Sequence, residues 1–251
     1  MTARGKWQGM MTIARLNWPF YVAAVFVFVG SLALFVASPR FEVRLGCAIA
    51  FAGAAYFLVG SLGVSHLIYD RSDLYRWSWL DRALGGTKRQ EFVFCHAGFD
   101  EASRSLHERL GEVGWLVLDH FDEARMTEAS IRRARCLFPP VKGTLPSLFD
   151  RWPVASQSVD VIFGLLAIHE LRSEGERTAW FAEARRCLRE GGRVILVEHP
   201  RDFANFLAFG PGFFHFHSSA SWRRCWEHAG LRASDGFRVT SWVSVFVIQA
   251  T

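Results

Sequence analysis

The chain has 251 residues, of which 51% are hydrophobic and 21% charged, so it is too apolar for a disordered protein and long enough for one domain with an added segment. Residues 1–44 carry five basic residues and one acidic residue, whereas residues 70–251 carry 24 basic and 23 acidic residues. A domain without a basic surplus is not expected to bind nucleic acid. The five cysteines are widely spaced and include no CxxC pair, which excludes a disulfide scaffold and favours a reducing compartment.

Two long uncharged segments predict a transmembrane helical hairpin. Residues 16–38 and residues 45–69 contain no Asp, Glu, Lys or Arg, and at about 1.5 Å per residue each can cross a hydrocarbon core of about 30 Å. Only a few residues separate them, so the two helices are expected to be antiparallel. A signal peptide is disfavoured because a second span follows at once. A pair of buried helices in a soluble domain is the remaining alternative.

Basic residues flank the hairpin on its outer sides. Arg4, Lys6 and Arg15 precede the first span, and three arginines follow the second between residues 70 and 82, whereas the loop between the spans has two. This distribution predicts a protein of the inner (cytoplasmic) membrane with both termini and the soluble domain in the cytoplasm. Residues 1–69 therefore form the tail and the two spans.

Residues 70–89 are expected to link the hairpin to the soluble domain. The sequence YDRSDLYRWSWLDR interleaves Tyr69, Tyr75, Trp77 and Trp79 with charged residues. Amphipathic aromatic side chains favour the headgroup layer, so we predict an interfacial linker. A helix that packs on the soluble domain is the alternative. The pair Gly85–Gly86 marks a break before the domain.

Residues 90–251 alternate between short apolar runs and helical segments, which predicts an α/β fold with a parallel sheet and helices on both faces. Ligands of such sheets bind outside the carboxyl ends of the strands. Strands are expected at 91–95, 115–118, 159–166, 193–198 and 242–248, and helices at 100–110, 127–136, 173–188 and 218–229.

The stretch WPVASQSVDVIFGLLAIHEL, followed by FAEARRCLREGGRVILVEH, resembles class I S-adenosylmethionine-dependent methyltransferases of the small-molecule (type 11) kind. The order and spacing of the motifs agree over more than fifty residues, and the resemblance covers about residues 90–251. Glu190 stands where the family has proline. The resemblance implies a Rossmann-like methyltransferase sheet with S-adenosylmethionine as cofactor. The matching residues are Trp152-Pro153, Asp160, Ile168-His169, Arg186, Leu188 and Gly191-Gly192.

The cofactor loop departs from the family pattern. In the family an acid and three glycines follow the first strand, whereas this chain has FCHAGFD, in which only Gly98 matches and His96 occupies part of the loop. The resemblance implies that Asp119 holds the ribose hydroxyls and that Asp150 lies near the adenine. Asp119 as a helix N-cap or turn residue, and Asp150 as a solvated acid, are the alternatives.

Candidate catalytic side chains follow two predicted strands. His169 comes after the strand at 159–166, and Glu198 and His199 end the strand at 193–198, where an acceptor of the methyl group would approach. A base is needed only when the nucleophile must lose a proton, and structural histidines are the alternative. A metal site drawn from His169, Glu198, His199, His215 and His217 has no supporting ligand spacing, so no metal is predicted.

The segment Pro200–Ser218 is rich in phenylalanine and has Gly210 and Gly212 at its middle. The resemblance places it in the substrate lid, and its aromatic character suits an apolar substrate drawn from the bilayer; a packed core is the alternative. We therefore expect a membrane-anchored methyltransferase that acts on a lipophilic small molecule such as a quinone, carotenoid, tetrapyrrole or lipid. The rival hypothesis is a catalytically lapsed accessory or assembly subunit of a larger membrane protein complex, which the degenerate cofactor loop motivates.

Overall fold

The computed structural model describes residues 4–86 and 90–250, which form two compact units. We call residues 4–72 and 203–213 the hairpin unit, and residues 73–202 and 214–250 the sheet unit. The division after residue 72 lies close to the predicted end of the hairpin. The hairpin unit, however, also takes in 203–213, the middle of the aromatic segment that the sequence places in the soluble domain. Residues 87–89 of the predicted linker lie outside the described residues.

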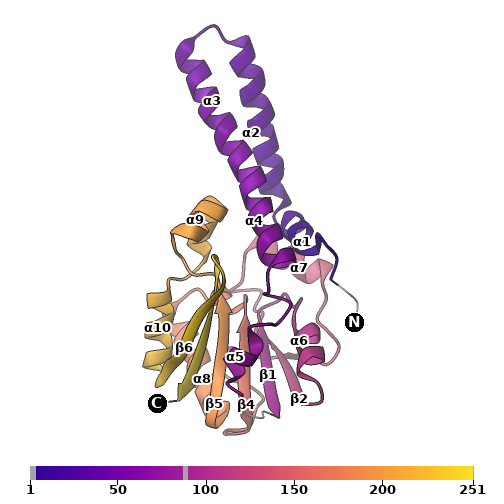
Figure 1. The fold of residues 1–251 in the computed structure, drawn as a ribbon, viewed down its shortest axis with the longest axis vertical. Helices are drawn as coiled ribbons and strands as arrows, with labels where there is room; N and C mark the ends of the chain where they lie inside the picture. Colours follow the sequence, from indigo (N-terminus) through magenta and orange to yellow (C-terminus); the bar gives the residue numbers. More distant parts are fainter. Residues whose placement is uncertain (1–3, 87–89, 251) are drawn as a thin grey trace. The chain divides into compact units, whose positions relative to one another are not determined.

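The hairpin unit contains two helices that are long and apolar enough to cross a membrane, α2 and the helical stretch Phe41–Arg71. Only 6% and 17% of their apolar windows are buried, so these helices do not resemble the core helices of a soluble protein. Figure 1 shows them as the long pair α2 and α3–α4. The elements are α1 (Gln8–Leu16), α2 (Trp18–Ala37), α3 (Phe41–Tyr56), the π-helical turn η1 (Phe57–Ser61), α4 (Leu62–His66), the π-helical turn η2 (Leu67–Arg71) and α9 (Phe203–Phe209).

Aromatic and hydroxyl contacts join α2 to the following helix. The rings of Phe28 and Phe51 stack with centroids 4.3 Å apart, and the hydroxyl groups of Tyr21 and Ser61 hydrogen-bond at 3.0 Å. The connection between the helices is shorter than the sequence suggested, because α3 begins at Phe41 and includes Glu42 and Arg44. The first turn of α3 therefore contains charged residues, and the helix begins before the uncharged run does.

The short helix α1 is held by a residue sixty positions away. The carboxylate of Asp70 accepts hydrogen bonds from the backbone N–H groups of Gly9 (2.6 Å) and Met10 (3.1 Å), and it also lies 3.0 Å from Nδ1 of His66. An acid at the N-terminal turn satisfies free backbone donors and offsets the helix dipole. A Cβ on Gly9 would lie 2.3 Å from Cβ of Tyr69, so this close approach requires glycine.

The sheet unit has seven strands in the order β3-β2-β1-β4-β5-β7-β6. The first five are parallel, β7 runs antiparallel to β5, and β6 pairs antiparallel with β7. The α/β fold is confirmed, but a fully parallel sheet is wrong at this edge, because a short turn joins β6 to β7 and only antiparallel strands can be connected in that way. The strands are β1 (Glu91–His96), β2 (Gly114–Asp119), β3 (Leu145–Pro146), β4 (Val159–Leu165), β5 (Leu188–Glu198), β6 (Leu231–Thr240) and β7 (Val243–Ala250).

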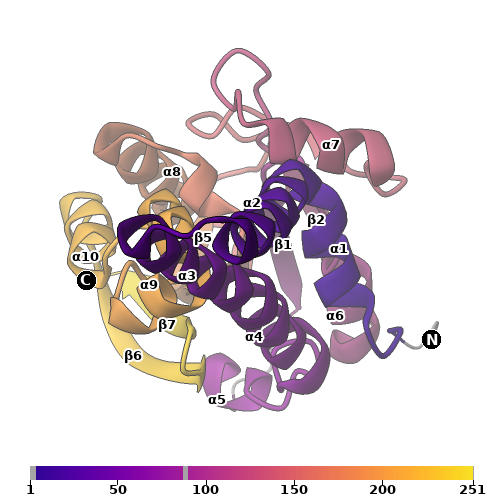
Figure 2. The ribbon, with the colours of Figure 1, turned by 90° about the horizontal axis from the view of Figure 1, so that it is seen from above.

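Helices flank this sheet on both faces. Figure 2 shows α8 and α10 on one face and α5 and α6 on the other. On the first face the rings of Trp180, Phe181 and Trp222 are fully buried and form the aromatic centre of the core. The helical elements of this unit are α5 (Leu80–Leu84), α6 (Ser103–Leu110), α7 (Ala129–Leu137), the 3-10 turn η3 (Ile168–Glu170), α8 (Glu174–Cys187) and α10 (Ser219–His228). The 3-10 turn η4 (Gly210–His215) begins in the hairpin unit and ends in the sheet unit.

The motif residues around β4 and β5 have structural roles. Asp160 accepts hydrogen bonds from the backbone N–H groups of Gln90 and Glu91, which ties β4 to the start of β1. Arg186 bonds Glu183 and the carbonyl oxygen of Val154.

The tryptophans of the predicted interfacial linker do not face a headgroup layer. Trp77 and Trp79 are 4% and 7% exposed, and Nε1 of Trp79 donates to the carbonyl oxygen of Leu74 at 3.1 Å. Tyr75 donates its hydroxyl to Glu101 in the same unit. These side chains are thus packed, as the alternative expects, but residues 72–79 form bends and turns, and a helix begins only at Leu80.

Candidate functional site

Candidate residues predicted from the sequence lie together at the carboxyl ends of four neighbouring strands. His96 and Asp119 end β1 and β2 and are direct neighbours in the register, and Glu198 ends β5. His169 lies in η3, immediately after β4. Because parallel strands all end at one edge, residues far apart in the sequence meet there.

Glu198 is the buried anchor of this edge. One carboxylate oxygen accepts the backbone N–H groups of Ala167, Ile168 and His169 at 3.2, 2.9 and 3.1 Å, and the other lies 2.7 Å from Nδ1 of His169. The residue is fully buried. Because an ionised carboxylate only accepts, Nδ1 of His169 carries the proton and Nε2 is left with its lone pair.

The turn that carries His169 is held in an uncommon backbone conformation. Leu166 has φ +50°, a region that non-glycine residues seldom adopt, and its N–H donates to the carbonyl oxygen of Val197 at 2.8 Å. Such positions cost about 1–3 kcal/mol and persist only where the surroundings fix them. The Glu198 carboxylate, which collects the next three N–H groups, supplies that constraint.

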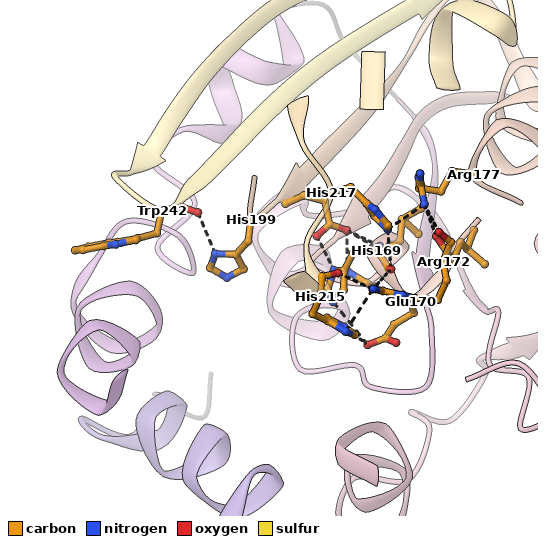
Figure 3. A network of polar contacts seen from close by, with 12 residues as sticks. His169, Glu170, Arg172, Arg177, His199, His215, His217 and Trp242 are labelled. Carbon is orange, nitrogen blue, oxygen red and sulfur yellow. Dashed lines mark hydrogen bonds and ion pairs between the residues drawn. The ribbon is translucent and has the colours of Figure 1, made fainter. Parts of the chain in front are cut away.

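Glu170 and His215 complete a cluster with His169 (Figure 3). Nε2 of His215 lies 3.3 Å from Oε1 of Glu170, and Nε2 of His169 lies 3.6 Å from the same oxygen. Nδ1 of His215 is 2.9 Å from Oε1 of Glu128. Although burial opposes a charge, the hydrogen bonds to Glu128 and Glu170 raise the pKa of His215 to about 9.

The other two histidines at this edge are engaged elsewhere. Nδ1 of His199 lies 2.9 Å from the carbonyl oxygen of Trp242, and its ring stacks on Phe216 with centroids 4.8 Å apart. Figure 3 shows His199 apart from the cluster. Burial, together with the nearby charge of Arg177, lowers the pKa of His217 to about 3, so this ring is neutral. Of the three predicted catalytic residues, the structure brings His169 and Glu198 into contact, whereas His199 lies apart from them.

Asp119 stands where the ribose-binding acid is expected, but its lone pairs are in use. One carboxylate oxygen accepts the N–H groups of Gly98 (2.9 Å) and Phe121 (3.0 Å), and the other pairs with Arg135. A Cβ on Gly98 would lie 2.7 Å from the ring of Phe121 and 3.3 Å from Cδ of Arg135. These two side chains occupy the space beside the only matching glycine of the loop.

The remaining predicted cofactor residues are His96 and Asp150. His96 is 1% exposed, and its Nδ1 lies 3.5 Å from Oδ1 of Asp119. Burial lowers its pKa, which keeps the ring neutral. His96 is thus a buried neighbour of the Asp119 carboxylate. Asp150 is exposed and has no hydrogen bond or ion pair within the described part of the chain.

A second buried histidine, His120, makes stability depend on pH. Its Nδ1 hydrogen-bonds the carbonyl oxygen of Ser147 at 3.1 Å, its ring stacks on Trp152, and burial lowers its pKa to about 4. Between pH 6.5 and 4 the unfolded chain binds a proton here that the folded chain refuses, so the free energy of unfolding falls as the pH falls.

We expect His120→Asn to reduce that acid sensitivity, because asparagine retains a donor near the position of Nδ1 and does not titrate. Between pH 7 and pH 5 the variant should lose about 2 kcal/mol less stability than the parent, from the linkage of a shifted pKa. Denaturant unfolding at the two pH values measures this difference. The exposed His228→Asn variant is the control, and equal pH slopes for parent and His120→Asn would contradict the assignment.

Several residues at this edge escape sequence reasoning. Phe121, Glu128 and Arg135 lie outside the predicted strands, and their roles depend on contacts with residues 16 to 87 positions away. Glu170 follows His169 directly in the sequence. The sequence around a residue in a helix or loop does not show which distant residue it contacts. Acids at the ends of predicted strands could therefore be identified as candidates, whereas these side chains could not.

No protein-family model matches the chain, and no curated protein matches it in sequence. Solved structures are similar to it. A SAM-dependent methyltransferase from Aquifex aeolicus has 17% identity and a TM-score of 0.53, over 70% of this chain and 90% of that one. A SAM-dependent methyltransferase from Leishmania major has 12% identity and a TM-score of 0.50, over 95% and 89%. The PH0226 protein from Pyrococcus horikoshii has the same identity and TM-score, over 70% and 90%. The sheet unit therefore has the Rossmann-like fold of S-adenosylmethionine-dependent methyltransferases.

Proposed function

We propose that the chain is a membrane-anchored S-adenosylmethionine-dependent methyltransferase that acts on a lipophilic small molecule. The observation that carries this proposal is the oriented imidazole of His169. Its Nδ1 is fixed by a fully buried carboxylate, and its Nε2 lone pair is held at the carboxyl edge of the sheet. The methyltransferase fold places ligands at this edge.

Asp119 and Gly98 are the residues that would hold the cofactor. When bound, S-adenosylmethionine supplies an already activated methyl group. The protein then has to align the acceptor and remove its proton where necessary. Binding requires Arg135 to release the Asp119 carboxylate and Phe121 to leave the space beside Gly98. Arg135 is a long side chain that is 30% exposed, so it can turn toward solvent.

His169 is the residue that would act on the acceptor. A hydroxyl group that approaches Nε2 can pass its proton to the ring, while Glu198 keeps Nδ1 protonated and stabilises the resulting charge. His199 has no part in this step because it lies apart from His169 and its ring stacks on Phe216. His217 has none because its Nε2 already contacts Arg177 and the backbone carbonyl oxygen of His169.

The aromatic segment supports an apolar acceptor. In the hairpin unit the hydroxyl of Tyr56 donates to the carbonyl oxygen of Leu207 at 2.5 Å, so α9 is hydrogen-bonded to the last residue of α3. Phe203 and Phe206 on α9 are 72% and 43% exposed. Exposed aromatic side chains beside an apolar helix favour a position at the bilayer surface. An acceptor dissolved in the bilayer is therefore the substrate that we infer.

Within the sheet unit, hydrogen bonds from Arg201 hold the last residues of the aromatic segment. Arg201 donates from Nε to the carbonyl oxygen of Phe216 at 2.6 Å and from Nη2 to that of Phe214 at 3.2 Å. His215 lies between these two carbonyl groups in the sequence. The cluster is thus connected by a short covalent path to the segment that belongs to the hairpin unit.

A second function is favoured by the filled cofactor space. If Phe121 and Arg135 remain in place, the chain binds no cofactor and serves as an accessory subunit of a membrane protein complex. The two candidates differ in one measurable property, the affinity for S-adenosylmethionine.

Calorimetric titration of the detergent-solubilised chain with S-adenosylmethionine tests the proposal. We expect binding by the parent, and we expect Asp119→Ala to weaken it about 10- to 100-fold, because hydrogen bonds to a carboxylate contribute about 1.5–3 kcal/mol each. Arg135→Ala should tighten binding, since it frees the carboxylate. No binding by either the parent or Arg135→Ala would establish the accessory function, and equal affinity in Asp119→Ala would make Asp119 a turn residue only.

A further inference from the structure

Three atoms that commonly bind metal ions converge after β4. Nε2 of His169, Oε1 of Glu170 and Nε2 of His215 all lie within 4.8 Å of one another. Figure 3 shows the two rings and the carboxylate turned toward a common point. His169, Glu170 and His215 all belong to the sheet unit, so the cluster does not depend on the hairpin unit.

The hydrogen bonds around the cluster leave lone pairs facing each other. Nδ1 of His169 donates to Glu198 and Nδ1 of His215 donates to Glu128, so in the neutral rings both Nε2 atoms are acceptors. Both face Oε1 of Glu170, which is also an acceptor, at 3.6 and 3.3 Å. The arrangement therefore needs a positive group between these atoms: either the proton that the raised pKa of His215 places on its Nε2, or a metal ion that replaces it.

The spacing and the charge both suit a divalent ion. Bonds of about 2.0–2.1 Å in a tetrahedral zinc site put neighbouring ligand atoms about 3.3–3.4 Å apart, close to two of the observed separations. Three carboxylates, those of Glu128, Glu170 and Glu198, hydrogen-bond or contact the two rings. Arg172, which donates to the carbonyl oxygen atoms of His169 and His215, is the cation beside them. With neutral imidazoles the group carries two negative charges in excess.

We propose that His169, Glu170 and His215 bind one divalent transition-metal ion of the Zn²⁺ class through Nε2, Oε1 and Nε2. Glu198 and Glu128 then have the role that carboxylates have behind metal-binding histidines, which is to fix the ring and its protonated nitrogen. Three protein ligands leave a position open for water or for an oxygen atom of a substrate. This proposal departs from the sequence analysis, which predicted no metal site.

The metal would change how the acceptor is activated. If the proposed methyl transfer is correct, His169 is a metal ligand and the ion, in place of the imidazole, lowers the pKa of an acceptor hydroxyl bound at the open position. The metal site itself does not depend on that function. It predicts a binding stoichiometry that can be measured without substrate or cofactor.

The test is a titration of the full-length, detergent-solubilised chain, stripped of metals by a chelator, with Co²⁺. We expect visible absorption bands that saturate at one equivalent and disappear when Zn²⁺ is added. His215→Ala should weaken binding at least 100-fold, and Glu128→Gln about 10- to 100-fold, the effect typical of a carboxylate behind a metal ligand. Both residues are partly exposed, so these variants test the site without removing a core side chain.

The exposed His228→Ala variant is the matched control and should bind Co²⁺ as the parent does. Absence of saturable Co²⁺ binding, or equal affinities for His215→Ala and His228→Ala, would overturn the metal site. In that case the cluster is held by protonated imidazoles. Binding of S-adenosylmethionine, measured on the same preparation, separates this outcome from failure of the proposed function, because methyl transfer with His169 as base needs no metal.

Discussion

Replacing Glu198 with alanine is expected to lower the free energy of unfolding of the sheet unit by about 3–5 kcal/mol. The substitution leaves three buried backbone N–H groups and Nδ1 of His169 without an acceptor, and each orphaned donor costs about 1–3 kcal/mol before the surroundings relax. The strained turn at Leu166 also loses the contact that fixes it. Urea unfolding followed by near-ultraviolet circular dichroism measures the loss.

Two further variants make this expectation specific. Glu198→Gln retains a carbonyl oxygen for the N–H groups and should cost less, but its amide can turn a donor toward Nδ1 of His169 and reverse the tautomer. Glu190→Ala removes an exposed carboxylate from the same strand and should be nearly neutral. If Glu198→Ala proved no less stable than Glu190→Ala, the carboxylate would not organise the edge of the sheet.

Two arginines in the middle of α2 are expected to prevent its insertion into the membrane. Val25 and Val29 lie one turn apart and are 48% and 57% exposed, so in a bilayer their side chains would face lipid. Each arginine at the centre of a span costs about 2.5–3.5 kcal/mol, or about 5–7 kcal/mol for the pair. The Val25→Arg, Val29→Arg double variant should therefore fail to place the loop between the two helices outside the cell.

A cysteine at Ser38 reports that placement. In the Ser38→Cys background a membrane-impermeant maleimide added to intact cells should label the chain, because the basic residues at the outer flanks predict an external loop. Labelling should be lost in the double arginine variant and kept in the matched Val25→Leu, Val29→Leu variant. Undiminished labelling with both arginines present, or labelling of the parent at the exposed Cys136, would contradict the proposed topology.

The strands were predictable where both faces of the sheet are buried, because their sequences are then continuous apolar runs. The runs that form β1, β2, β4 and residues 193–198 of β5 are largely apolar because both of their faces are covered, and each was placed to within one residue. β5 itself begins five residues earlier, at Leu188, and its residues 189–191 are exposed, so no apolar run marks that part. Only Leu231 of β6 is buried, since β6 is the edge strand, and its sequence LRASDGFRVT has no apolar run to mark it. An edge strand depends on its partner for its hydrogen bonds, which local sequence does not report.

The residues of the site that end buried strands were predictable from the sequence, whereas their contacts were not. His169, Asp119 and Glu198 follow buried strands, so topology alone brings them to one edge. The contacts that define the chemistry are tertiary. Whether Asp119 faces a ribose or Arg135, and whether His169 faces solvent or Glu170, depends on side chains that approach from α7 and from the segment after α9. No local periodicity encodes those approaches.

The hairpin unit has a consequence for how such a chain could have arisen. The polypeptide passes between the two units at three places, after residues 72, 202 and 213. A gene fusion that added helices to the start of a soluble domain would account for only the first of these. The stretch that contains α9 lies more than 130 residues further along, between two strands of the sheet, and it is joined to the hairpin through Tyr56. Deletion of residues 4–72 would therefore not simply reverse such a fusion, because α9 would lose the hydrogen bond that Tyr56 provides.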